Sequence, residues 1–459
     1  MSRKKNIVII ALLALILSMS ACAKPVSNVD VPEAVSEVPE VVSIDPQYIN
    51  TVLDTLISED FTGRLPGTEG NKKVEEFLQS EMETIGLSAP EFASSYLHGF
   101  DLLVPLKQKV TEFELVDVDG AVVHKFDFGD DFTEYIARDF AMGIGEFQGA
   151  YTIVDDPFVV GKVDEMTEDD IWVFSRNATA SSSYDVFFKS VLNSDRKPKV
   201  IIYESDQLNN DHFILSPYTG LMQHNDNENG VLIYRVSPGA FQMIKDADQK
   251  FLKVSTAADV KTVEVSNVVG MIDGKADHGY VISAHFDHLG DNLDGTVNYG
   301  ALDNASGVSA MMALAEAMVR DGEQELDYYF IAFNGEEEGL HGSTAFVREN
   351  FLDVEKFQII NMDMLGSNTP IEFEISATHP QSTELSQWIF ENAKEYGINA
   401  ITSNIGASDH FPFEQAGFAA VTLIEFDKRF YHTPYDTKDA SIDLEHLADL
   451  TQFVFELLQ

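Results

Sequence analysis

Apolar runs and helical patterns alternate over the C-terminal half of the chain. Continuous apolar runs of strand length occur at residues 268–271, 280–284, 328–333, 357–362 and 419–425. Segments with helical spacing of apolar residues lie between or after them, at 307–320, 343–350, 383–396 and 443–458. Strands that alternate with helices are typical of a parallel sheet covered on both faces. The pattern therefore predicts an α/β fold, with a mixed but mainly parallel sheet sandwiched by helices.

The region before this half has a different texture. Short β-like runs bounded by Asp, Gly and Asn occur there, together with one helical pattern. The clearest strands are at 110–118, 171–174, 199–203 and 230–236, and the helical pattern is at 184–192. The order strand, helix, strand indicates a compact α+β module. We therefore predict that residues 94–261 are a smaller inserted domain, between an N-terminal part at 46–93 and a main domain at 262–459.

Residues 46–93 contain an amphipathic helix. Apolar residues recur on one face of residues 71–85, and Gly86 then ends the helix. The preceding loop, FTGRLPGTEGN, contains Arg64 and several glycines. These residues suit either contact with a ligand or a plain turn.

The N-terminus has the parts of an export signal. Basic residues precede an apolar run at 7–17, which is too short to span a membrane as a mature helix. Small residues then lead to Cys22, the single cysteine of the chain. This segment resembles a bacterial lipoprotein signal, and an ordinary secretory signal is the alternative. We expect residues 1–22 to be a lipoprotein signal peptide, 23–45 to be a flexible tether, and Cys22 to anchor the exported protein to the extracytoplasmic side of the cell membrane.

Charge excludes one class of partner. The chain has 30 Lys and Arg against 76 Asp and Glu, so its formal net charge is −46. Such a surface repels phosphate backbones, and we therefore expect no nucleic-acid partner. The same acidity suits a solvated extracellular surface and does not identify a substrate.

Carboxylates and imidazoles follow the apolar runs of the C-terminal half. The carboxyl ends of parallel strands meet at one edge of a sheet, where α/β proteins place their active crevices. Buried charges at that edge would be costly unless they met a cation. The residues concerned are His285, Asp287, Asp303, Glu336, Glu337, Glu338, Asp363, Tyr431, His432 and Asp436.

This residue set suits metal-assisted hydrolysis. Imidazoles with several carboxylates are typical of zinc, and Co or Mn would accept a similar set. One carboxylate can bridge two ions with its two oxygens. A pair of ions that share a water can activate it as a nucleophile and polarise a carbonyl.

Six motifs carry a resemblance to a known family. They are HFDHLG, GALDNASG, NGEEEGLHGS, NMDMLG, SDHFPF and YHTPYDT. Their order and approximate spacing resemble the M28 family of di-zinc aminopeptidases. The resemblance implies that His285 and Asp363 hold one zinc ion. It implies that Glu337 and His432 hold the second, with Asp303 bridging the two.

The same resemblance implies further roles. Glu336 would be the general base, Asp287 would orient a metal-bound histidine, and Tyr431 would stabilise the oxyanion. The family's cis peptide is expected at Asp303–Asn304. Members of the family often contain a protease-associated domain between their first helices and the catalytic sheet, and residues 94–261 occupy that position.

Neighbouring residues within the motifs have simpler explanations. We expect Glu338, His288 and His341 to be exposed neighbours of the site. His410 could line a substrate pocket or cap its loop. Asp436 could support the site or simply belong to a turn.

We therefore expect a zinc-dependent exopeptidase that hydrolyses N-terminal residues from extracytoplasmic peptides. Carboxypeptidases and glutaminyl cyclases share this fold and are alternatives within it. A lipid-anchored peptide-binding protein is an alternative of another class, which the water-activating residue set disfavours.

Overall fold

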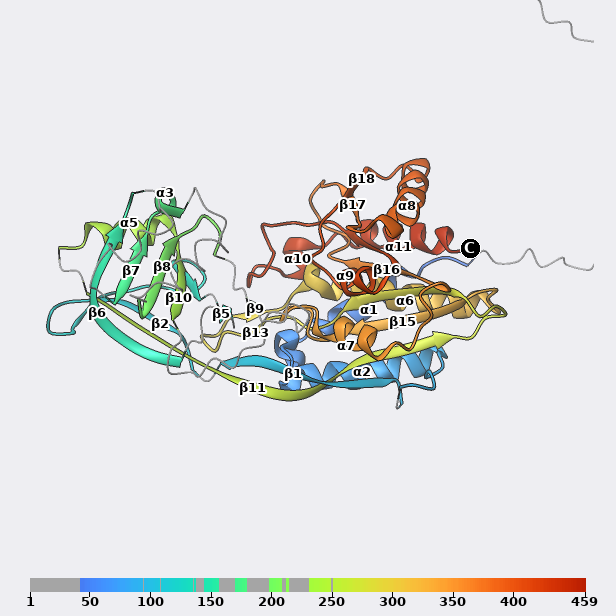
Figure 1. The fold of residues 1–459 in the computed structure, drawn as a ribbon, viewed down its shortest axis with the longest axis horizontal. Coiled ribbons are helices and arrows are strands. Elements are labelled where there is room, and N and C mark those ends of the chain that lie inside the picture. Colours follow the sequence, from blue (N-terminus) through green and yellow to red (C-terminus); the bar gives the residue numbers. More distant parts are fainter. Residues whose placement is uncertain are drawn as a thin grey trace, which may run out of the picture. The chain divides into compact units, whose positions relative to one another are not determined.

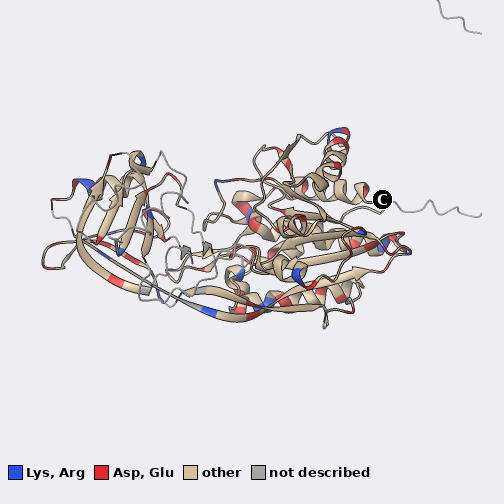
Figure 2. Ribbon diagram, in the orientation of Figure 1, with Lys and Arg blue, Asp and Glu red and all other residues tan. Residues whose placement is uncertain are grey.

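The computed structural model describes residues 42–93, 95–107, 109–134, 136–137, 144–156, 170–179, 198–208, 212–213, 231–248 and 251–459 (Figure 1). The expected signal peptide and Cys22, most of the tether and the helix expected at 184–192 lie outside these residues. Within the described ranges, no helix combines the length and apolar character needed to cross a membrane. Acidic residues occur along helices and loops throughout the ribbon (Figure 2).

Two helices open the described chain, joined by a 3-10 turn. They are α1 (Pro46–Leu56), η1 (Glu59–Arg64) and α2 (Glu69–Ile85). The Thr68 side chain caps α2 by accepting a hydrogen bond from the backbone N–H of Asn71. Gly86 ends the helix in the left-handed conformation, as the sequence predicts.

The central strands of the main sheet are parallel. β12 (Gly279–His285) pairs with β15 (Asp327–Phe333) on one side and β16 (Phe357–Asp363) on the other, and β16 pairs with β19 (Ala419–Ile424). Antiparallel strands flank them, β11 (Phe251–Ile272) beside β15 and β17 (Phe373–Ser376) beside β19. The sheet edge is β18 (Ala400–Ser403), parallel to β17. This arrangement confirms the predicted mixed, mainly parallel sheet.

Both faces of this sheet are covered by helices. On one face α6 (Gly307–Asp321) packs with α1 and α11 (Leu444–Leu457) over Ile282 and Phe330. On the other, α7 (His341–Glu349) and α9 (His410–Ala416) cover Val281 and Ile331. Successive strand residues thus enter opposite cores, which explains why the strands are continuous apolar runs. The remaining elements of this region are α8 (Thr383–Tyr396), α10 (Lys438–Ser441), η5 (Ala301–Ser306), η6 (Pro380–Ser382), β13 (Gly290–Asp291) and β14 (Val297–Asn298).

A second group of strands has a core of its own. β6 (Ile144–Val154), β7 (Ile171–Phe174), β8 (Val200–Glu204) and β10 (Leu232–Val236) pair in parallel in this order. α5 (Pro238–Asp246) contributes Phe241 and Ile244 to their core. The other elements are β1 (Leu97–Lys107), β2 (Glu112–Val116), β3 (Val122–Lys125), β4 (Phe132–Glu134), β5 (Ile136–Ala137), α3 (Arg176–Thr179) and β9 (His212–Phe213).

Strand β11 belongs to both groups. Its residues 251–257 pair with β6, and its residues 268–272 pair with β15. The domain border expected at residue 261 therefore falls inside a continuous strand, and the domain limits stay a prediction.

Candidate metal centre

The candidate centre lies at the carboxyl edge of the parallel strands. His285 is the last residue of β12, and Asp363 is the last residue of β16. Asp303 lies in the turn η5 that precedes α6. Because the strands are parallel, their ends meet at this edge. The five predicted ligands, His285, Asp303, Glu337, Asp363 and His432, are all buried.

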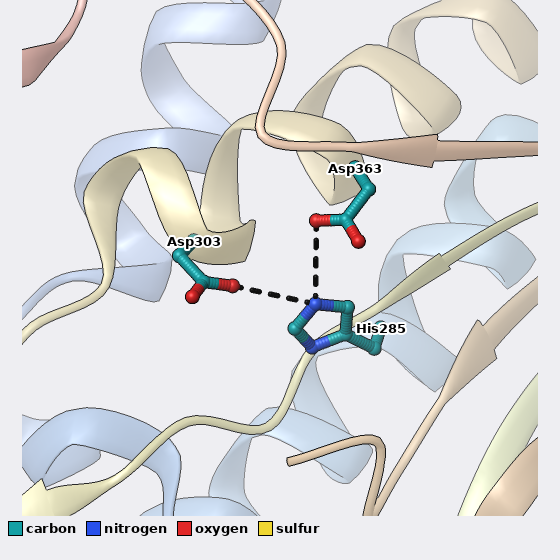
Figure 3. A group of neighbouring side chains, drawn as sticks. All are labelled: His285, Asp303 and Asp363. Carbon is teal, nitrogen blue, oxygen red and sulfur yellow. Dashed lines mark ion pairs between the residues drawn. The ribbon is translucent and has the colours of Figure 1, made fainter. Parts of the chain in front are cut away.

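A first cluster joins three of these residues. His285 Nε2 lies 3.4 Å from Asp303 Oδ1 and 3.6 Å from Asp363 Oδ1 (Figure 3). The three ligand atoms all lie within 4.8 Å of one another. Ligands at about 2.0–2.1 Å from one tetrahedral ion would be separated by about 3.3 Å, so these spacings suit a shared cation.

A second cluster surrounds Glu337. His432 Nε2 lies 2.8 Å from Glu337 Oε2, and His288 Nδ1 lies 2.6 Å from Glu337 Oε1. His432 Nε2 is also 3.5 Å from Asp303 Oδ2. His288, Asp303 and Glu337 form a further group with metal-ligand spacing. Asp303 therefore contributes one oxygen to each cluster, as a bridging carboxylate requires.

The expectation that His288, Glu338 and His341 are exposed is wrong. His288 and Glu338 are completely buried, and His341 is 7% exposed. The backbone N–H of His288 donates to Arg64 O, and its imidazole packs against Gly300, where an added Cβ would lie 2.5 Å from the ring. The N-terminal turn η1 thus covers the loop after β12, which no local pattern in that loop could show.

The buried carboxylates repel one another. Burial raises the pKa of Asp303, and Glu337 raises it further. Burial also raises the pKa values of Glu336 and Glu338 well above their usual range, and that of Asp409 to about 7. Burial alone would raise the pKa of Glu337 as well, but His432 and His288 hold it well below its usual range. Such excess negative charge in a buried site favours binding of a cation.

Unpartnered carboxylate oxygens are a second observation that supports a cation at this site. Asp303 Oδ2 and Asp363 Oδ1 are buried oxygens with no hydrogen-bond partner within the part of the chain that the structure describes. The other oxygen of Asp363 accepts a hydrogen bond from the Ser408 hydroxyl at 2.7 Å. One oxygen is thus held in place while the other faces the cluster.

The residues expected to act on substrate line the same cavity. Glu336 and Tyr431 border it together with the two clusters. Asp287 lies 3.7 Å from His285 Nδ1, and it also accepts the backbone N–H groups of Glu336 at 3.1 Å and Glu337 at 3.2 Å. Asp287 therefore positions the loop of Glu336 in addition to facing His285.

Asp436 supports the turn that carries the shared ligand. Its carboxylate accepts hydrogen bonds from the backbone N–H groups of Leu302 and Asp303, each at 2.9 Å. Asp436 is fully buried, and its backbone N–H also donates to Thr433 O, so it both closes a turn and supports the site. The peptide between Asp303 and Asn304 is cis, as predicted.

Arg64 is a buried cation beneath the centre. Its guanidinium donates to the carbonyl oxygens of Phe286 at 2.6 Å, Tyr299 at 2.6 Å and Gly300 at 2.9 Å. Burial lowers the pKa of Arg64 to about 10, which leaves it charged at neutral pH. Gly63 allows this approach, because a Cβ there would lie 2.3 Å from the Asn298 carbonyl oxygen. Arg64 thus binds backbone carbonyls and fixes both ends of the loop between His285 and Asp303.

His410 lines the cavity, which is one of the two alternatives that the sequence left open for it. Its Nδ1 lies 2.6 Å from the Thr422 hydroxyl. Burial lowers its pKa to about 4, so the ring is neutral at neutral pH.

Comparison with known proteins agrees with this geometry. Residues 267–458 match the model of peptidase family M28. This region is therefore similar to members of that family, and we call it the M28 region. The M28 region begins inside β11 and ends with α11, so it contains all the strands and loops of the two clusters.

Curated relatives of this chain include two exopeptidases by name. Aminopeptidase YwaD of Bacillus subtilis is 28% identical over 178 residues, which cover 36% of each chain. A glutamate carboxypeptidase 2 homolog of Caenorhabditis elegans is 29% identical over 254 residues, covering 47% of this chain and 31% of the relative. The chain thus spans about a third of the length of these relatives.

Solved structures show the same fold. An aminopeptidase from Aneurinibacillus sp. strain AM-1 superposes with a TM-score of 0.65 at 18% identity, covering 90% of this chain and 93% of that one. BSAP, a zinc aminopeptidase from Bacillus subtilis, has a TM-score of 0.61 at 18% identity, covering 92% and 96%. The likeness in fold therefore extends well beyond the M28 region.

Proposed function

We propose that this protein is a zinc-dependent exopeptidase that removes N-terminal residues from peptides. The observation that carries the proposal is the pair of buried clusters that share Asp303 beside Glu336 on one cavity. The M28 region and its likeness to named aminopeptidases support it. Two clusters of imidazoles and carboxylates like these suit zinc. BSAP of Bacillus subtilis is likewise a zinc aminopeptidase.

His285, Asp363 and Asp303 would hold one zinc ion, and Glu337, His432 and Asp303 the other. Bound zinc supplies an acidified water and polarises a carbonyl group. Glu336 accepts a proton from the attacking water and delivers it to the nitrogen of the leaving amine as the C–N bond breaks. Tyr431 donates a hydrogen bond to the oxygen that gains negative charge. Asp287 keeps the Glu336 backbone at a fixed distance from His285 throughout.

The proposal is tested with a panel of aminoacyl-anilides, free peptides and N-blocked peptides. Zinc-loaded protein should release N-terminal residues from free peptides, and a chelator should abolish the release. Release from the carboxyl end of N-blocked peptides would instead make the protein a carboxypeptidase. Failure to hydrolyse any member of the panel with zinc present would contradict the proposal.

We also propose that the protein is exported and anchored by a lipid on Cys22. The support is the order of basic residues, apolar run and cysteine at the N-terminus. Full-length protein expressed in a bacterium should sediment with membranes and carry a lipid mass on Cys22. The Cys22→Ala variant should leave the membrane fraction, and an unchanged distribution would contradict the anchor.

A further inference from the structure

One wall of the cavity lies beyond the two metal clusters. Strand β17 alternates there, because Phe373 and Ile375 enter the core while Glu374 and Ser376 line the cavity. β17 pairs antiparallel with β19, with Glu374 opposite Ile424 and Ser376 opposite Thr422. Ile424 and Thr422 also line the cavity. The wall is therefore one face of a two-strand ladder, whose register fixes which side chains it presents.

Most of the surface that lines the cavity is apolar. The cavity measures about 200 Å³. Its apolar lining residues are Met364, Ile405, Ala407, Ile424 and Phe426. Ile405 and Phe426 are about half exposed, so they border the opening. A side chain of a bound peptide would thus rest on apolar surface along much of its length.

Among the described lining residues, Glu374 is the one carboxylate besides Glu336 that lies outside the two metal clusters. Its Oε1 is buried and has no hydrogen-bond partner among the described residues. No lysine or arginine occurs among the lining residues in the described part of the chain. Glu374 is also not among the residues with metal-ligand spacing. Oε1 of its carboxylate is thus a buried oxygen for which the described residues supply no partner.

Ser376 lies on the same face of β17 and, unlike Glu374 Oε1, has hydrogen-bond partners within the protein. Its hydroxyl donates to Ile405 O at 2.7 Å and accepts from Ile405 N and the Ser403 hydroxyl, each at 2.9 Å. Ser376 therefore fastens the loop after β18. Glu374 makes no comparable bond through Oε1, so loop support does not explain the carboxylate.

We propose that Glu374 selects peptides whose N-terminal residue is lysine or arginine. This inference rests on the proposed aminopeptidase function and names its substrate class. The methylene groups of such a side chain cover the apolar wall, and its cationic end pairs with Glu374. An acidic side chain would be repelled by the same carboxylate, and an aliphatic one would leave Oε1 of Glu374 buried and unpaired.

The test compares anilide derivatives of lysine, arginine, leucine and glutamate. Wild-type kcat/KM should be highest for lysine and arginine and lowest for glutamate. Glu374→Gln should lower kcat/KM for lysine and arginine about tenfold and change that for leucine less than threefold, because one charge-assisted contact is worth about 1.4 kcal/mol or more. Glu372→Gln, an exposed change just before the same strand, should leave all four values unchanged.

Several results would overturn the inference while the proposed function stands. These are a wild-type preference for leucine over lysine, or an equal loss for every substrate in Glu374→Gln. Binding of free lysine and leucine to the zinc-loaded protein separates the two proposals. If no anilide is hydrolysed but lysine binds more tightly than leucine only when Glu374 is present, the proposed hydrolysis is wrong, while recognition of a basic side chain by Glu374 stands. Equal binding of both amino acids, unchanged in Glu374→Gln, would overturn the inference.

Discussion

Buried carboxylates in two regions of this molecule have opposite environments. In the second group of strands, Glu134 lies 3.0 Å from Lys107 Nζ and accepts hydrogen bonds from the hydroxyls of Thr111 and Thr256. Burial alone would raise the pKa of Glu134, but Lys107 and the two hydroxyls lower it below its usual value. At the metal centre, by contrast, burial and neighbouring charge raise the pKa of Asp303.

The difference shows that the protein supplies a cationic side chain for Glu134 but, among the described residues, no lysine or arginine that pairs with Asp303. The side chains of Lys107 and Glu134 are 6% and 3% exposed, and the pair is complete without a ligand. Arg64, a buried cation close to the centre, directs its hydrogen bonds to backbone carbonyls. We infer that Glu134 stabilises the fold through its ion pair with Lys107, whereas the carboxylates of the centre bind metal ions taken up from solution.

The largest expected effect tests the role of Glu336 at the centre. Glu336→Gln keeps the shape of the side chain but removes the base, so kcat should fall by about 10²–10⁴-fold. Zinc content, measured by mass spectrometry, should stay at the wild-type level because Glu336 is not among the proposed ligands.

Glu355→Gln, at an exposed position, is the control and should retain wild-type kcat. If Glu336→Gln kept most of its turnover, the assignment of the base would be wrong.

The next effect concerns the ion pair of Glu134 with Lys107. Lys107→Met should destabilise the protein by about 3–5 kcal/mol, because Glu134 would be left buried without its partner. The free energy of unfolding in urea measures this loss. Lys107→Met combined with Glu134→Leu should recover most of it, since no charge then remains buried.

Lys125→Met is the matched control on the exposed side of β3 and should have little effect. A Lys107→Met variant as stable as wild type would show that the pair does not stabilise this region.

A smaller effect is expected from His288, which contacts Glu337 at 2.6 Å. His288→Ala should weaken zinc binding by about 10–100-fold, the usual cost of removing a group that positions a ligand. Competition with a fluorescent chelator measures the affinity. The exposed His278→Ala should bind zinc normally, and an unchanged affinity in His288→Ala would remove His288 from the centre.

The smallest effect is a pH dependence of stability. Since the pKa of Glu134 is lowered in the folded protein, its stabilisation is fully present above the ordinary value of 4.5 and is lost as the pH falls through the folded value. Glu134→Gln should therefore have a flatter stability curve on the acid side of pH 4.5. Urea titrations across that range would detect it, and parallel curves for both proteins would contradict the role of the pair.

The strands and the polar residues at their carboxyl ends could be predicted from the sequence for a simple reason, whereas the ligand assignments rest on the family resemblance. His285 and Asp363 directly follow continuous apolar runs, and parallel strand ends converge. The burial of His288 could not be predicted, because it depends on Arg64, more than 200 residues earlier, closing over the same loop. Glu374 was missed because its direction depends on the pairing register of β17 with β19, which no motif records.

We propose above all that Asp303 is shared by two cations. The most direct measurement is the number of zinc ions retained per chain after reconstitution and desalting, in wild type and in Asp303→Asn, with the exposed Asp321→Asn as control. We expect two zinc ions per chain in wild type and in the control, and a loss of at least one in Asp303→Asn. A wild-type protein that retains fewer than two, or an Asp303→Asn variant that retains both at undiminished affinity, would contradict it.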